Sequence, residues 1–199
     1  MAGIGLHGFY AAKATITTGA VSAYSTWKKI GRAINVAFTP AEGSTNDLWS
    51  DNAIGETDAR QGSGGEVTCT LDRLTEDAYV DLFGYTLSTS SVTVNSSSVT
   101  GTGFAITGAE QSNPVGFGYV LWNQESNDRN KYVAVVYRNV TFKPPAVNGQ
   151  TMGESVEWQT PEITGTVVGK EGDGTKPWTE VKKFPSQAAA IAFITGYTA

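Results

Sequence analysis

The chain has 199 residues, of which 40% are hydrophobic and 11% aromatic, with a formal net charge of -5. This composition supplies enough apolar side chains for a hydrophobic core and excludes a globally disordered chain. The acidic balance argues against binding nucleic acid through its phosphates, which requires a basic face.

Strands are predicted along most of the chain, because β-branched and aromatic residues alternate with breaks at Gly, Asn, Ser and Pro. The segments that fit are 13–18, 27–40, 63–73, 92–107, 115–124, 131–143 and 154–169. In 27–40 the alternation predicts a core side formed by Ile30, Ile34, Val36 and Phe38. Asn35 and Thr39 are predicted to lie on the opposite, polar side.

Residues 42–65 are too long for an ordinary connection and show neither a helical stripe nor a clean alternation. We expect a long loop over about 41–64 that is disordered in the free subunit, because its Gly, Ser, Asn and Asp residues bury little apolar surface. Trp49 and Ile54 stand out in it, since a mere linker does not need large apolar side chains.

The next segment predicts a strand followed by a short helix. In EVTCTLD, Val67, Cys69 and Leu71 oppose the polar Glu66, Thr68 and Thr70. The helix is expected to begin at the N-cap Thr75 and to end at Gly84.

The remaining segments predict two hairpins and a second helix. Segments 115–124 and 131–143 flank the polar stretch ESNDRN, which favours a hairpin. The Ser- and Thr-rich stretch 86–103 is expected to form an outer hairpin. A second helix is expected between the N-cap Ser186 and Gly196. Its apolar side is expected to include Ala188, Ile191, Ala192, Ile194 and Thr195.

Residues suited to catalysis or metal binding are scarce. The chain has one histidine and one cysteine, which is too few to build a zinc site and leaves almost no residues for a nucleophile-base pair. Cys69 falls on the core side of its strand, which favours a buried structural thiol in a reducing compartment. We therefore expect no enzyme, no metal site and no cofactor. No apolar run reaches the roughly 20 residues that cross a bilayer, and no signal peptide is visible.

The acidic residues are concentrated in one window. Between Ala41 and Tyr85 there are ten acids and two bases, and ten minus two gives a net charge of -8. A solvated acidic face is one interpretation. The other is a surface that must repel a polyanion.

The order of these elements resembles the major tail protein, or tail tube protein, of long-tailed siphophages. The resemblance covers nearly the whole chain. Its most specific parts are the strand-helix unit GGEVTCTLDRLTEDAYVDLFGY and the phrase VEWQTPEITGT. The other matching parts are GLHGFYAAKATITTG, IGRAINVAFTP, the acidic LWSDNAIGETDA and the hairpin GFGYVLWNQ…KYVAVVYRNVTF.

The resemblance implies a mainly β fold with one or two short helices, a tail-tube-type β-sandwich or barrel with a flanking α-helix. It implies a single domain over 1–199, with an N-terminal arm at about 1–12, the long loop as a stacking loop, and a C-terminal arm or helix at about 170–199. Six copies would form a ring, and stacked rings would form the tail tube of the virion, made in the host bacterial cytoplasm. If each copy adds four strands, about 24 strands at roughly 4.8 Å give a barrel about 37 Å across, enough for a DNA duplex.

The same resemblance implies the partners. The chain would contact itself, the tape-measure protein inside the tube, and the tail terminator and distal tail protein at the tube ends. DNA would pass through without specific binding, and no membrane would be involved. The lumen-facing candidates are Asn35, Thr39, Glu66, Thr68 and Thr70. The inter-ring contact candidates are Trp49, Asp51, Ile54 and Glu56.

Two alternatives remain open at this point. A carbohydrate- or protein-binding β-sandwich module of a phage tip or cell surface would use some of the five tryptophans as exposed stacking platforms. A hydrolase with paired carboxylates would require a deep acidic cleft.

Overall fold

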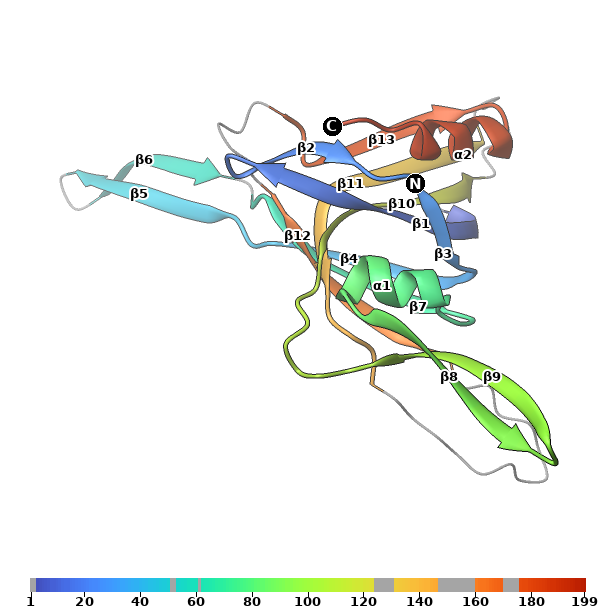
Figure 1. The fold of residues 1–199 in the computed structure, drawn as a ribbon. Helices are drawn as coiled ribbons and strands as arrows, with labels where there is room; N and C mark the ends of the chain where they lie inside the picture. Colours follow the sequence, from blue (N-terminus) through green and yellow to red (C-terminus); the bar gives the residue numbers. More distant parts are fainter. Residues whose placement is uncertain (1–2, 51–52, 61, 124–130, 147–159, 170–175) are drawn as a thin grey trace, which may run out of the picture.

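The computed structural model describes residues 3–50, 53–60, 62–123, 131–146, 160–169 and 176–199, and side chains are described except at 3, 4 and 44–60. The fold is mainly β with two short helices, a β-sandwich with a flanking helix, as the sequence predicts (Figure 1). The strands are β1 (Gly3–Thr17), β2 (Ala20–Tyr24), β3 (Lys28–Gly31), β4 (Ala33–Pro40), β5 (Ser44–Ser50), β6 (Ala53–Arg60), β7 (Gly64–Leu71), β8 (Thr86–Val94), β9 (Ser97–Ala105), β10 (Pro114–Asn123), β11 (Tyr132–Phe142), β12 (Glu162–Val168) and β13 (Thr179–Phe184). The helices are α1 (Glu76–Phe83) and α2 (Gln187–Thr195).

Nine of the described strands form one sheet in the order β2-β1-β10-β11-β12-β7-β4, with β3 also pairing with β1 and β13 with β11. The long strand β11 changes partners along its length. Residues 132–137 pair with β13, and residues 140–142 pair with β12. This exchange lets one sheet curl around a core instead of lying flat.

The central hairpin β10–β11 is buried on both faces. One face contributes Phe117, Tyr119 and Tyr137 to the main core, which also takes in β1, β7, β12 and α1. The other face packs against α2, where Ala190 and Ile194 are buried. Gly118 permits this close packing, because a Cβ atom there would lie 2.8 Å from the Ile194 Cγ2 atom.

Both helices begin and end where the sequence predicts. The Thr75 hydroxyl accepts a hydrogen bond from the Ala78 N–H, and Gly84 ends α1 with a φ of 71°. Ser186 caps α2 in the same way. The apolar side expected for α2 is correct at the buried Ile194 and the half-buried Ile191, and wrong at Ala188, Ala192 and Thr195, which are exposed.

Two hairpins project from the body of the molecule (Figure 1). The expected outer hairpin is confirmed as β8–β9. The other, β5–β6, occupies the segment expected to be a loop without regular structure, and that expectation is wrong. In the described structure β5–β6 is a two-stranded sheet that pairs with no other strand.

The two terminal segments expected as arms also belong to the sheet. Residues 3–12, expected as an N-terminal arm, lie in β1 and pair with β10. In the segment 170–199, β13 pairs with β11 and α2 packs on the sheet. Most of the described part of segment 170–199 therefore belongs to the body of the subunit.

The predicted strand 27–40 is divided at Arg32 into β3 and β4, and its pairing with β7 shifts between Ala33 and Asn35. This bulge places Ala33 against the main core and leaves Ile34 53% exposed. The prediction that Ile34 shares the core side with Val36 and Phe38 is therefore wrong, because one extra residue reverses the alternation on one side of a bulge.

Candidate functional site: the polar face of β4, β7 and β12

All five lumen-facing candidates lie on one surface of the sheet, and β12 extends that surface. Strand pairing arranges the side chains in three rows across β4, β7 and β12. We call this surface the polar face. Its rows are Asn35, Thr70 and Glu162; Ala37, Thr68 and Thr164; and Thr39, Glu66 and Thr166.

The polar face is open to solvent in the single subunit. Its central residues Thr68 and Thr70 are half-buried, and the other positions of β4 and β7 named in the rows are exposed. With strands about 4.8 Å apart and rows about 7 Å apart, the face covers roughly 10 Å by 14 Å.

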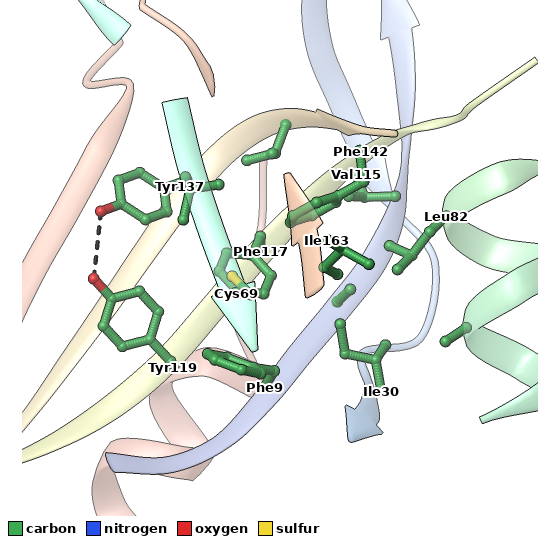
Figure 2. Close-up of a cluster of buried hydrophobic side chains, with 14 of the residues drawn as sticks. Phe9, Ile30, Cys69, Leu82, Val115, Phe117, Tyr119, Tyr137, Phe142 and Ile163 are labelled. Carbon is green, nitrogen blue, oxygen red and sulfur yellow. Dashed lines mark hydrogen bonds between the residues drawn. The ribbon is translucent and has the colours of Figure 1, made fainter. Parts of the chain in front are cut away.

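The reverse side of the same three strands belongs to the main core. Val67, Cys69 and Leu71 are fully buried, as the alternation of β7 predicts. Figure 2 shows Cys69 and Ile163 pointing toward Phe117. The polar face is thus the solvent side of a sheet whose other side is buried in the core, and strand pairing sets the spacing of its residues.

Chemically, the polar face consists of five threonine hydroxyl groups, one amide, the carboxylates of Glu66 and Glu162, and the methyl group of Ala37. None of its nine residues is Lys or Arg. At its margin, the backbone N–H of the exposed Lys143 donates to the Thr164 carbonyl oxygen. The face can hydrogen-bond water, but it lacks the cations that hold phosphate groups.

The one cysteine and the one histidine of the chain, the residues most suited to nucleophilic chemistry, do not belong to the polar face. Burial raises the pKa of the Cys69 thiol, which therefore stays protonated and unreactive at neutral pH. The half-buried His7 ring lies 6.2 Å from the Tyr132 ring, centroid to centroid. Among the described residues, no group of three His, Cys, Asp or Glu side chains could hold a metal ion.

Two grooves adjoin the C-terminal residues Gly196–Ala199, with volumes of about 570 and 450 Å³. The first is lined by Tyr24 and Trp27, and the second by Arg138, Lys182 and Glu180. Glu180 is the one acidic side chain among their described lining residues, so neither has the paired carboxylates that a glycoside hydrolase needs.

The tryptophans whose side chains are described do not form exposed platforms. Trp27 is buried, and its indole N–H donates to the Tyr197 carbonyl oxygen at 3.0 Å. Trp122 and Trp178 are half-buried. A module that stacks sugar rings on exposed tryptophans gains no support from these three residues.

Three of the four inter-ring candidates, Trp49, Ile54 and Glu56, lie in the strands of the β5–β6 hairpin. Trp49 and Ile54 are paired across its two strands, and Glu56 is paired with Leu48. The side chains of these residues lie outside the described part of the structure, as does Asp51 as a whole. Their contact role stays a prediction.

Sequence reasoning missed the contribution of β12. The signal was present in EITGTVV, where Glu162, Thr164 and Thr166 alternate with Ile163, Gly165 and Val167. The adjacency of Thr164 to Thr68 depends on strand order, which alternation within one segment does not reveal.

No protein-family model matches the chain, and no curated protein is significantly similar to it. In the described part of the chain, no helix is long and apolar enough to cross a membrane.

Proposed function

We propose that the chain is the structural subunit of a tail tube of a long-tailed bacteriophage. Six copies form a ring, rings stack into a tube around the tape-measure protein, and DNA passes through the bore during ejection. The observation that carries this proposal is the polar face, in which all five residues predicted to face the lumen lie together on one side of β4, β7 and β12.

The chemistry of the polar face suits a bore through which DNA moves. Hydroxyl groups keep the wall hydrated, and Glu66 and Glu162 carry charge of the same sign as phosphate. A wall with lysines or arginines would retain the duplex through phosphate contacts. The polar and acidic side chains of the proposed bore therefore keep it hydrated and do not bind DNA tightly.

The shape of the subunit also supports an assembled role. Two hairpins extend from the body, and each consists of only two strands in the described structure. A two-stranded ribbon is marginally stable in water by itself, and a neighbouring subunit can supply the missing contacts. In this proposal Trp49 and Ile54 of β5–β6 contact the next ring.

The first test is electron microscopy of the purified protein over a range of concentrations. Rings or tubes of uniform diameter are expected. A protein that stays monomeric at every concentration tried, including in the presence of tail initiation complexes, contradicts the proposal.

The second test locates the polar face in the tubes. Thr68→Cys should react with a maleimide on a polymer too bulky for the bore in the free subunit, and at least about tenfold more slowly in tubes. Ala188→Cys on the exposed side of α2 is the control, with Cys69 left in place because it is buried. Equal rates for Thr68→Cys in tubes and subunits would show that the face lies outside.

A further inference from the structure

The hairpin β8–β9 is unusual in its lack of charge. Between Asp81 and Glu110 the sequence contains no charged residue. Six of the ten large apolar side chains that are exposed among the described residues also lie here: Leu87, Val92, Val94, Val99, Phe104 and Ile106. Exposed ribbons usually carry charges that prevent pairing with other chains, so this one is suited to being covered.

The two faces of the hairpin differ. Toward its tip, one face presents Val92 paired with Val99, with Val94 beyond them, and these three side chains are 51–59% exposed. We call this the valine face. The opposite face carries hydroxyl groups, with Ser91 paired with Thr100 and Thr93 with Ser98. Toward its tip, the hairpin thus repeats the division of β7 into an apolar and a hydroxyl side, whereas at its base the pair Leu87–Phe104 lies on the same face as the hydroxyl groups.

The base of the hairpin is attached to α1. The Phe104 ring stacks on Tyr79 at 4.5 Å and lies 5.2 Å from Tyr85, measured between centroids. The Thr102 hydroxyl donates to Glu76 at 3.3 Å. These contacts set the direction of the ribbon and leave its tip beyond the body (Figure 1).

Strand β4 offers a surface that matches this hairpin. In the described structure β4 pairs with β7 alone, so its other edge has no strand beside it. Its eight residues, AINVAFTP, include no charge. Val36 and Phe38 on its core side are only half-buried, so the apolar layer is incompletely covered at this edge.

We infer that the β8–β9 hairpin of one copy adds to the free β4 edge of a second copy, an inference that rests on the proposed function. One outer strand of the hairpin pairs with β4 through backbone hydrogen bonds. The valine face continues the apolar side formed by Val36 and Phe38. The hydroxyl face continues the polar face beyond Asn35 and Thr39.

Length and charge both favour a second copy as the partner. The paired strands match in length, with nine residues in β8 and in β9 against eight in β4. The whole chain has a net charge of -5, so two copies repel wherever acidic surfaces meet. Neither the hairpin nor β4 contributes to that repulsion, because both lack charge.

The first experiment places a charge on the valine face. Val92→Lys and Val99→Lys should leave the free subunit folded, because both valines are exposed there. They should raise the concentration needed for half-maximal assembly at least about tenfold, since lysine would have to be buried against the neighbour. Thr93→Lys is the matched control on the opposite face, and it should assemble nearly as the native chain does.

The second experiment detects the contact itself. Ala37→Cys on β4 and Ser91→Cys on the hairpin are made in separate chains, mixed, and treated with a short bismaleimide. A covalent pair formed in the mixture, and not in either variant alone, is expected. Thr100→Cys replaces Ser91→Cys in a parallel sample, so that addition through either strand of the hairpin is detected.

The outcomes separate this inference from the proposed function. Suppose that the native chain forms rings or tubes. If Val92→Lys and Val99→Lys then assemble as the native chain does, the hairpin contact alone is overturned. The same holds if neither hairpin position cross-links to Ala37→Cys. A cross-link between copies without any ring or tube supports the contact and overturns the tube. A cross-link together with impaired assembly of the two lysine variants supports both.

Discussion

The pair β7–β12 and the pair β8–β9 have similar sequences but different surroundings. Both are antiparallel and contain several threonines, and β7–β12 and the tip of β8–β9 each have an apolar and a hydroxyl side. In β7–β12 the apolar side is fully buried against the main core, whereas in β8–β9 the valines are more than half exposed. Alternation therefore defines which side of a strand is apolar, and the tertiary structure decides whether anything covers that side.

The largest expected difference between the two pairs is in core truncation. Phe117→Ala, in the main core behind β7 and β12, should reduce the free energy of unfolding by about 3–5 kcal/mol. Val99→Ala in the hairpin should change it by less than about 0.5 kcal/mol. Urea unfolding of the free subunit measures both. Similar values for the two variants would mean that the hairpin is already covered in the free subunit.

Adding a methyl group should show the same contrast on a smaller scale. A Cβ atom at Gly165 in β12 would lie 2.7 Å from side-chain atoms of Val140 and Phe142, so Gly165→Ala should cost about 1–3 kcal/mol. Gly103 in β9 has no atom within 4 Å of such a Cβ, and Gly103→Ala should be close to neutral. Thermal unfolding of the two alanine variants checks this prediction, and a neutral Gly165→Ala would refute tight packing behind the polar face.

The main core should also make stability sensitive to alkaline pH. Burial raises the pKa of Tyr137 and of Tyr119 above the ordinary 10.0, and their hydroxyl groups lie 3.4 Å apart (Figure 2). The unfolded chain loses these protons above pH 10 while the folded chain keeps them, so stability is lost as pH rises. For each tyrosine this loss approaches about 1.4 kcal/mol per pH unit only where the pH is well above 10 and still below the pKa of the folded state.

Tyr137→Phe provides the check on this pH dependence. The free energy of unfolding of this variant should fall less between pH 10 and 11 than that of the native chain, because one buried phenol is missing. Urea unfolding at each pH measures this difference. The hairpin β8–β9 has no titratable side chain, so variants within it should leave the slope unchanged. An unaltered slope in Tyr137→Phe would contradict the burial of this phenol.

The smallest effect is expected at the connection from the hairpin to β10. Hydrogen bonds from the Thr107 N–H and hydroxyl, and from the Gly108 N–H, lower the pKa of Glu110 to about 2. Its ionised form contributes stability above the ordinary pKa of 4.5, and this contribution is lost as pH falls toward 2.

Glu110→Gln tests this acid dependence. The variant should be slightly less stable than the native chain at pH 6 and should lose less stability between pH 4.5 and pH 2. An NMR titration of the native side chain gives the pKa directly. A midpoint near 4.5 would show that the Thr107 contacts do not persist in solution.

Much of the local structure was predictable from the sequence. Thr75 and Gly84 delimit α1 because a hydroxyl cap and a left-handed glycine act on the residues next to them. The alternation of Val67, Cys69 and Leu71 gave the correct buried side of β7, and with it the polar face of that strand. Capping and side-chain alternation need only local interactions, so no knowledge of distant segments is required.

Long-range pairing was decided by the tertiary structure alone. The bulge at Ile34 and the addition of β13 to β11 both depend on partners distant in sequence. The polar face combines both levels: the sequence identified its residues on β4 and β7, and strand order placed Thr164 beside Thr68. Register and strand order follow from which apolar sides meet in one core, and no single segment contains that information.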